Sequence, residues 1–214
     1  QGLAHGGALG NLFASPSTQQ VYSVGRTAHA GGGVLLSYGN YAGDVLNFDA
    51  AQRRLAAEGI PTRTVVVTDD VKSAPIHEKS RRRGIAGDLT VFRAAAAAAE
   101  SGYDLDAVAE IARTANERTR SFGVAFSGCT LPGAAEPLFT VPSGRMAVGL
   151  GLHGEPGVSE VETPTADELA ELLVSTLLDR DELPEGVETP RGARVIPILN
   201  GLGSVKYEEM FVVY

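Results

Sequence analysis

The chain has 214 residues, of which 43% are hydrophobic and 21% are charged, and its formal net charge at pH 7 is −8. This is the composition of an ordinary globular protein, and the length suffices for one substantial core or two smaller ones. An acidic surface repels phosphate backbones, which argues against non-specific nucleic-acid binding. The longest apolar run, residues 94–99, is far too short to cross a membrane. Because Cys129 is the only cysteine, no disulfide can form within the chain, and we expect a cytoplasmic protein.

The first half of the chain has the pattern of a parallel α/β unit. Residues 34–38 and 64–68 are apolar runs that predict buried strands, and Asp44 is expected to cap the helix between them, which ends at Gly59. A strand, a helix and a second strand within about 35 residues indicate a βαβ unit with parallel strands. Further helices are predicted at residues 17–30, with Ser17 as N-cap, and at residues 88–101 and 105–120.

After residue 120 the pattern changes to short strands separated by Pro and Gly turns. A helix capped by Thr165 is predicted over residues 165–178. The expected fold class is therefore α/β, with a parallel-sheet α/β domain over residues 1–120 and a smaller α+β domain over residues 121–214. The strands of the second domain are predicted at residues 122–126, 139–141, 146–152 and 195–199.

His153 stands out among the four histidines as a candidate for chemistry. An apolar strand runs directly into it, and Gly154, Pro156 and Gly157 then turn the chain sharply. Side chains that a turn presents at the end of a strand commonly form sites, and small neighbours leave room for a ligand. A turn histidine that hydrogen-bonds only its own loop is the simpler interpretation of the local pattern alone.

Acidic residues follow both predicted strands of the first domain. Asp44 lies at the edge where α/β sheets bind ligands, although a helix cap worth about 1 kcal/mol also explains it. Asp69 and Asp70 could bind a cation, but a surface turn is the simpler prediction. The polar segment 69–87 contains the basic residues 79–83, and it predicts a solvated loop or a docking patch for an acidic partner or a phosphate. No nucleotide-binding motif and no cluster of metal ligands is evident in the sequence.

Two longer motifs resemble the substrate-binding subunit of the dihydroxyacetone kinase family. Residues 39–48, Gly-Asn-Tyr-Ala-Gly-Asp-Val-Leu-Asn-Phe, are similar to the family's Asn-Tyr-x-Gly-Asp-x-Leu-Asn-Phe segment. Residues 152–157, Leu-His-Gly-Glu-Pro-Gly, are similar to the family's second signature. The similarity covers essentially the whole chain. Shorter matches follow the family order at residues 66–71, 82–87, 127–132 and 200–203.

The resemblance implies a component of a ketose kinase. In the family, the histidine of the second signature bonds covalently to the ketone carbon as a hemiaminal, which assigns this role to His153. The family's aspartate corresponds to Asp44, which would hydrogen-bond a substrate hydroxyl and help to remove its proton. The nucleotide lies on a separate helical domain or subunit. We therefore expect this chain to bind no cofactor or metal itself, with ATP or ADP and Mg²⁺ on the partner and, in some members, a phosphotransferase-system protein as the donor.

Two departures from the family pattern bear on the substrate. Bacterial members carry a lysine immediately before the Asn-Tyr pair, where this chain has Gly39. Loss of the ammonium group and its bulk changes which ketose fits, so Gly39 counts as a substrate-binding position. The family's first signature, Gly-Gly-Gly-Ser-Gly-His-Glu-Pro, is missing, and we expect a fragment truncated at both ends.

The function expected from the sequence is that of a dihydroxyacetone kinase, which binds the ketose through His153, Asp44 and Gly39 and phosphorylates a primary hydroxyl. One alternative is a kinase of a related ketose such as erythrulose, and another is a non-catalytic, ketose-binding regulatory paralogue. The expected partners are the ketose, a nucleotide-binding kinase domain or subunit, and a second copy of the chain in a homodimer. Neither nucleic acid nor a membrane is expected to bind.

Overall fold

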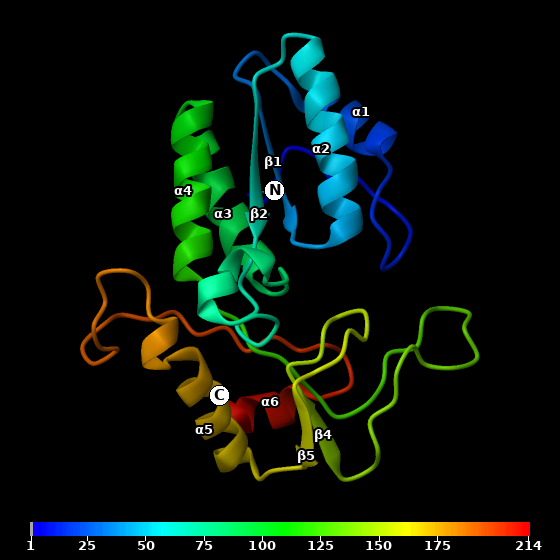
Figure 1. Ribbon diagram of the computed structural model, residues 1–214, viewed down its shortest axis with the longest axis vertical. Coiled ribbons are helices and arrows are strands. Elements are labelled where there is room, and N and C mark those ends of the chain that lie inside the picture. Colours follow the sequence, from blue (N-terminus) through cyan, green and yellow to red (C-terminus); the bar gives the residue numbers. More distant parts are fainter. Residues whose placement is uncertain (1) are drawn as a thin grey trace. The chain divides into compact units, whose positions relative to one another are not determined.

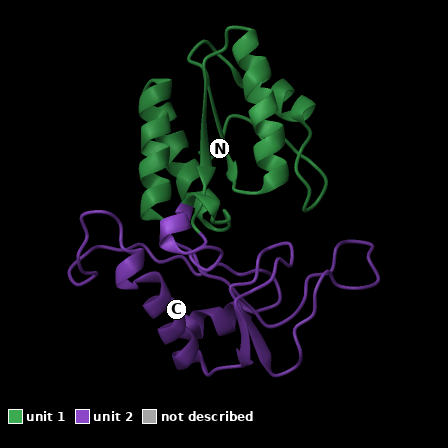
Figure 2. Ribbon diagram, viewed as in Figure 1, with its two compact units in different colours: residues 1–69, 80–119 green, residues 70–79, 120–214 purple. Residues whose placement is uncertain are grey.

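The computed structural model describes residues 2–214. It divides into two compact units, which are coloured separately in Figure 2: Gln1–Asp69 with Ser80–Thr119, and Asp70–Lys79 with Arg120–Tyr214. The predicted boundary at residue 120 placed residues 70–79 in the first domain, whereas they belong to the second compact unit. As a statement about independently folding domains, that boundary stays a prediction.

A two-stranded parallel sheet lies between helices in the first unit (Figure 1). The strands β1 (Val34–Gly39) and β2 (Thr62–Val67) pair in register, with Gly39 opposite Val67. The helix α2 (Ala42–Ala57) connects them. The predicted βαβ unit is therefore confirmed, and both strands end at the same edge of the sheet.

Helices cover both faces of this sheet and bury one core on each. On one face, α1 (Thr18–Ala28) packs with α2 against β1. On the other face, α3 (Gly87–Glu100) and α4 (Leu105–Arg118) pack against β2. The alternating burial along β1 matches the two-residue period of a strand. The cores contain Val21, Leu36, Ala51 and Leu55 on the first face, and Val65, Val67, Val91, Ala95 and Val108 on the second.

The predicted cap of α1 is confirmed, whereas that of α2 is wrong. Ser17 and Gln20 form a reciprocal capping box at the start of α1. The N-cap of α2 is Tyr41, whose backbone is extended and whose carbonyl accepts the N–H of Val45. Asp44 therefore lies in the first turn of α2 and does not cap it. A carboxylate in that turn is stabilised by the positive end of the helix dipole.

The second unit contains an antiparallel sheet and a packed helix. Its three strands are β3 (Val124–Ala125), β4 (Arg145–Val148) and β5 (Ser159–Glu162), in that spatial order. The helix α5 (Ala166–Leu177), capped by Thr165 as predicted, shares a small core with β4. An α/β fold with a parallel sheet and a separate antiparallel sheet is therefore confirmed. The remaining helices are short: η1 (Ile76–Arg81), η2 (Arg180–Glu182) and α6 (Tyr207–Val213).

Two of the predicted strands do not form. Residues 139–141 and 195–199 lie outside every strand of the described chain, and Ile196 is 90% exposed. The predicted strands at residues 122–126 and 146–152 are shortened to β3 and β4, and β4 ends where Gly149 adopts a φ of 71°. An apolar run becomes a strand only where a neighbouring strand pairs with its N–H and C=O groups.

The polar segment after β2 is buried in part, contrary to the prediction of a surface turn and a solvated loop. Asp69 and Asp70 are 0% and 1% exposed, and the basic run contains the fully buried Arg82. The carboxylate of Asp69 accepts hydrogen bonds from backbone N–H groups, which offsets the cost of removing it from water. Among residues 2–214, no group of three or more His, Cys, Asp or Glu side chains is arranged to hold a metal ion.

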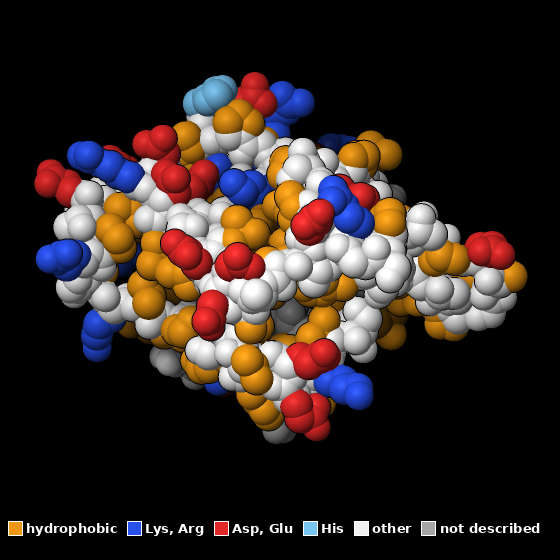
Figure 3. Space-filling model, turned by 90° about the horizontal axis from the view of Figure 1, so that it is seen from below, with side chains coloured by type: hydrophobic (Ala, Val, Ile, Leu, Met, Phe, Trp, Pro, Cys, Tyr) orange, Lys and Arg blue, Asp and Glu red, His pale blue; other side chains and the backbone are white. Residues whose placement is uncertain are grey.

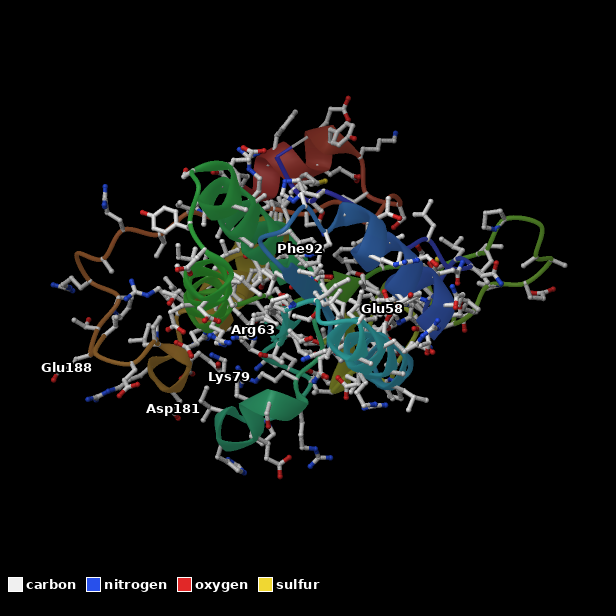
Figure 4. The ribbon with its side chains drawn as sticks, turned by 90° about the horizontal axis from the view of Figure 1, so that it is seen from above. Glu58, Arg63, Lys79, Phe92, Asp181 and Glu188 are labelled. Carbon is white, nitrogen blue, oxygen red and sulfur yellow. The ribbon has the colours of Figure 1, made fainter. Side chains whose placement is uncertain are left out.

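The surface carries both signs of charge. Exposed ion pairs join Arg26 to Glu58 and Arg63 to Asp106, and Figure 4 labels Glu58 and Arg63. Each such pair contributes only about 0–1 kcal/mol to stability. The face drawn in Figure 3 mixes acidic, basic and hydrophobic side chains. No helix in the described part of the chain combines the length and the apolar character that crossing a bilayer requires.

Replacing Gly84 by alanine is expected to destabilise the first unit. A Cβ at residue 84 would lie 2.5 Å from Cα of Gly39 and 2.6 Å from the carbonyl oxygen of Val67, and neither backbone atom can rotate away. We expect the free energy of unfolding to fall by about 1–3 kcal/mol, as measured by urea denaturation. Gly32→Ala is the control, because no heavy atom lies within 4 Å of a Cβ there. An unchanged stability of Gly84→Ala would contradict the close approach of the two backbones.

Candidate functional site

The carboxyl edge of the parallel sheet is a meeting point of three segments. The N–H of Asn40 donates to the carbonyl of Val67 at 3.1 Å, which joins the loop after β1 to the end of β2. The side-chain amide of Asn40 donates to the carbonyls of Ser80 and Arg82, at 3.0 and 2.8 Å. Asn40 therefore holds the loop before α3 against this edge, where open α/β sheets bind their ligands.

Asp69 fixes the start of α3 from a distant position in the sequence. Its Oδ1 accepts the N–H of Ile85 at 3.0 Å, and its Oδ2 accepts the N–H of Gly87 at 2.8 Å. The N-cap residue of α3 is Ala86, whose side chain has no acceptor. Asp69 therefore satisfies the first N–H group of α3, at Gly87, and the N–H of Ile85 just before the helix, where Ala86 offers no capping side chain.

Gly39 lies in backbone contact with the loop before α3. A Cβ at residue 39 would lie 2.9 Å from the carbonyl oxygen of Gly84 and 3.3 Å from Oδ2 of Asp88. It would also lie 3.3 Å from the ring of Tyr41. Position 39 consequently has no room for a larger side chain in this arrangement, and the carboxyl of Asp88 lies directly beside it.

Asp88 is a partly buried carboxyl that the sequence analysis treated only as the start of a helix. Burial, followed by the negative charges of Asp69 and Asp44, raises its pKa to about 7. Its Oδ1 is buried and has no hydrogen-bond partner among residues 2–214. One feature of the sequence points to this group. Asp88 follows the loop after the second predicted strand, and that loop begins at the edge where a ligand is expected.

Tyr38 adds a second buried polar atom near Asp44. The residue is 6% exposed, and its ring packs on that of Phe48 with centroids 4.2 Å apart. Its hydroxyl has no hydrogen-bond partner in the described part of the chain. Burial, together with the negative charges of Asp49 and Asp44, raises the pKa of Tyr38 to about 12, so the hydroxyl stays neutral and can donate a hydrogen bond.

His153 lies in a tight turn of the second unit, after β4. Its Nδ1 lies 2.8 Å from Oε1 of Glu155, and its backbone N–H donates to Oε2 of the same carboxylate at 3.0 Å. The turn is closed by the N–H of Gly154, which donates to the carbonyl of Gly151 at 3.1 Å. The side chains of His153 and Glu155 are 30% and 32% exposed, so both remain accessible to a ligand.

The contact with Glu155 bears on which ring nitrogen of His153 carries a proton. Burial acts to raise the pKa of the Glu155 carboxyl, but hydrogen bonds from the ring of His153 and from the backbone N–H groups of Glu155 and His153 outweigh it and hold this pKa below its ordinary value. The carboxylate is therefore ionised at neutral pH and can only accept hydrogen bonds. Nδ1 must carry the proton, and the lone pair of the neutral ring is on Nε2. In the sequence, Glu155 counts only as a member of the turn motif at residues 152–157.

The three residues that the sequence singled out lie in different units. Gly39 and Asp44 belong to the first unit. A Cβ at residue 39 would lie 3.3 Å from Oδ2 of Asp88, and the negative charge of Asp44 contributes to the raised pKa of Asp88. His153 belongs to the second unit. The substrate-binding and catalytic roles of these residues stay predictions.

Comparison with known proteins identifies the family. The sequence model of the Dak1 domain matches residues 1–214. The chain belongs to the Dak1 domain family. The resemblance to the substrate-binding part of dihydroxyacetone kinases is thereby confirmed.

Relatives of this Dak1 domain include two erythrulose kinases and a dihydroxyacetone kinase of known structure. The domain is 67% identical to the L-erythrulose kinase of Pectobacterium atrosepticum and 56% identical to the D-erythrulose kinase of Mycolicibacterium smegmatis. Both matches cover the whole chain and 36% of the relative. The crystal structure of the dihydroxyacetone kinase from C. freundii in complex with AMP-PNP and Mg²⁺ is similar with a TM-score of 0.72. It is 35% identical in sequence, and the similarity covers 81% of this chain and 32% of that one. The Dak1 domain thus spans about a third of the length of these relatives.

Asp88→Asn is expected to stabilise the protein at alkaline pH. The folded-state pKa of Asp88 lies near 7 and the ordinary value is 3.8, so its stabilising contribution is complete below about pH 4 and is lost as the pH rises to 7. The amide removes this loss, and we expect a gain of about 1–3 kcal/mol in the free energy of unfolding at pH 8.

Urea titrations of wild type and variant at pH 5 and pH 8 measure the effect of Asp88→Asn. Asp106→Asn is the matched control, because Asp106 also lies in the first turn of a helix but has an exposed side chain. A parallel pH dependence of wild type and Asp88→Asn would contradict a raised pKa.

Proposed function

We propose that this Dak1 domain binds a short-chain ketose covalently, as part of a kinase that phosphorylates a primary hydroxyl of that ketose. The observation that carries the proposal is the hydrogen bond between Nδ1 of His153 and Glu155, because it makes Nε2 the nucleophilic nitrogen. The sequence alone placed dihydroxyacetone first. The erythrulose kinases at 67% and 56% identity favour the alternative, a four-carbon ketose.

The first step is addition of His153 to the ketone. Nε2 forms a bond to the carbonyl carbon while the C=O π bond opens, and the oxygen takes a proton from solvent and becomes a hydroxyl. The Nδ1 proton of the ring leaves to solvent through Glu155, so the adduct gains no net proton. The positive charge that develops on the ring is stabilised by the adjacent carboxylate of Glu155, toward which the Nδ1 proton is given up. The product is a hemiaminal, and no atom of the ketose leaves.

The covalent link fixes a small, flexible substrate before phosphoryl transfer. It holds the terminal hydroxyl in one orientation, which removes much of the entropic cost of the transfer step. It also selects carbonyl compounds over plain polyols such as glycerol. Asp44, at the carboxyl edge of the first unit, accepts a hydrogen bond from a substrate hydroxyl and helps to remove its proton as the phosphoryl group arrives.

The phosphoryl donor is a nucleotide with Mg²⁺ held on another domain or on a partner subunit. The C. freundii dihydroxyacetone kinase that resembles this domain was crystallised with AMP-PNP and Mg²⁺, and the similarity covers only 32% of that chain. Assembly of the Dak1 domain into a homodimer stays a prediction.

Adduct formation is the direct test of His153. Incubation of the full natural protein with erythrulose or dihydroxyacetone should increase its intact mass by the mass of the whole ketose, because hemiaminal formation expels no water. The increase should be absent in His153→Ala and present in His77→Ala, whose exposed histidine lies elsewhere in the second unit. Gentle electrospray mass spectrometry measures all three proteins.

The same samples distinguish the proposed function from its alternatives. An adduct on wild type that persists in His153→Ala would refute the assignment of the nucleophile. A ketose-binding regulatory paralogue would form the adduct and yet transfer no phosphoryl group from ATP to the ketose in the full natural protein. Absence of any adduct on folded wild-type protein would make His153 a turn residue only.

Glu155→Gln should weaken adduct formation without unfolding the turn. A neutral amide can bond to either tautomer of His153 and cannot stabilise the developing positive charge. Since a hydrogen bond to a charged group contributes about 1.5–3 kcal/mol, the ketose concentration for half-maximal adduct should rise roughly 10- to 100-fold. Glu160→Gln is the control. Glu160 lies on the exposed strand β5, where it pairs with Arg145 of β4 rather than with His153. An equal effect of both variants would rule out a specific role of Glu155.

A further inference from the structure

The first unit contains a partly buried carboxyl, that of Asp88, which its fold does not use. Asp88 lies in the first turn of α3, but the N–H groups of Ile85 and Gly87 at that helix start are bonded to Asp69. The Oδ1 atom of Asp88 is buried and lacks a hydrogen-bond partner among residues 2–214. An unsatisfied buried acceptor destabilises the folded protein, so its presence calls for a partner outside the described chain.

A second buried polar atom without a hydrogen-bond partner in the described chain lies near the carboxyl end of β1. The hydroxyl of Tyr38 is buried without a hydrogen-bond partner in the described part of the chain, and the residue is 6% exposed. It lies within range of the charge of Asp44, as Asp88 does. Two buried polar atoms without a partner in the described chain therefore occur near the carboxyl end of β1, the edge at which an α/β sheet binds its ligand. Tyr38 packs on the α2 side of β1, through Phe48, and Asp88 comes from α3.

The chemistry of these groups fits a polyhydroxylated ligand. A carboxyl and a phenol hydroxyl, each partly removed from water, form hydrogen bonds with alcohol groups rather than with apolar surface. Oδ2 of Asp88 would lie 3.3 Å from a Cβ at residue 39. The carboxyl therefore lies beside Gly39, which the sequence predicts to be a substrate-binding position. Erythrulose has one more hydroxyl than dihydroxyacetone, and the relatives at 67% and 56% identity are erythrulose kinases.

We propose that Asp88 is a specificity-determining residue, whose carboxyl hydrogen-bonds the hydroxyl that a four-carbon ketose has and dihydroxyacetone lacks. The inference rests on the proposed function, because it assumes that the ketose is bound at this edge while Asp44 holds one of its other hydroxyls. A site built to bond a hydroxyl discriminates strongly against an analogue without it, since the buried polar group is then left unpaired.

The test compares two ketoses on the full natural protein. Adduct occupancy is titrated by intact mass spectrometry with erythrulose and with dihydroxyacetone, for wild type, Asp88→Ala, Asp88→Asn and Asp106→Asn. In Asp88→Ala the half-saturating concentration of erythrulose should rise roughly 10- to 100-fold, and that of dihydroxyacetone by less than about threefold. Asp88→Asn should lie between wild type and Asp88→Ala, because an amide still hydrogen-bonds a hydroxyl. Asp106→Asn should match wild type for both ketoses.

The outcomes separate this inference from the proposed function. An equal loss for both ketoses in Asp88→Ala, or no loss for either, would overturn the specificity role while the adduct itself still supports ketose binding. Failure of both Asp88 variants to fold would also overturn it, because the carboxyl would then be structural. Absence of an adduct on wild type with either ketose would remove the proposed function, and the specificity role with it.

Discussion

The carboxylate of Asp69 is the constraint on which the ligand edge of the first unit depends. Placed directly after β2, it bonds the N–H groups of Ile85 and Gly87 and so fixes the start of α3 to the end of the sheet. A chain reversal of some fifteen residues lies between these partners, and no residue within it caps the helix. Without Asp69 the N–H groups of Ile85 and Gly87 would lose these partners, and a buried N–H group that is left unsatisfied costs about 1–3 kcal/mol.

Fixing α3 in this way has a consequence for the chemistry of the edge. Gly84 lies against Gly39 with room for no side chain on either residue, and Asp88 is brought beside the end of β1. Asp69, two residues after β2, bonds the N–H groups of Ile85 and Gly87 at the start of α3, so these groups do not depend on Asp88. The carboxyl of Asp88 is close to the charges of Asp69 and Asp44, an arrangement that destabilises its ionised form. Retaining a costly group that the fold does not require is typical of functional sites.

The sequence predicted those parts of the molecule whose cause is local. The βαβ unit, the Ser17 and Thr165 caps and the helices α3 and α4 follow from patterns within a few residues. The apolar run at residues 195–199 has the same local pattern as β1, yet it forms no strand because no partner strand pairs with it. The burial of Asp69 and Arg82 was missed for the same reason, since their polar character predicts exposure until their neighbours in space are known.

The candidate residues of the two units differ in the same respect. His153 contacts Glu155, which lies two residues away in the same turn, so a short motif contains both residues and a sequence can reveal them. The environment of Asp88 depends on Gly39, the last residue of β1, and on Asp69, which follows β2. Under the proposed function, a histidine encoded in a short motif can remain unchanged while distant substitutions change the polar groups around Asp88. Discrimination between ketoses of different length would then depend on which buried groups a given ketose satisfies.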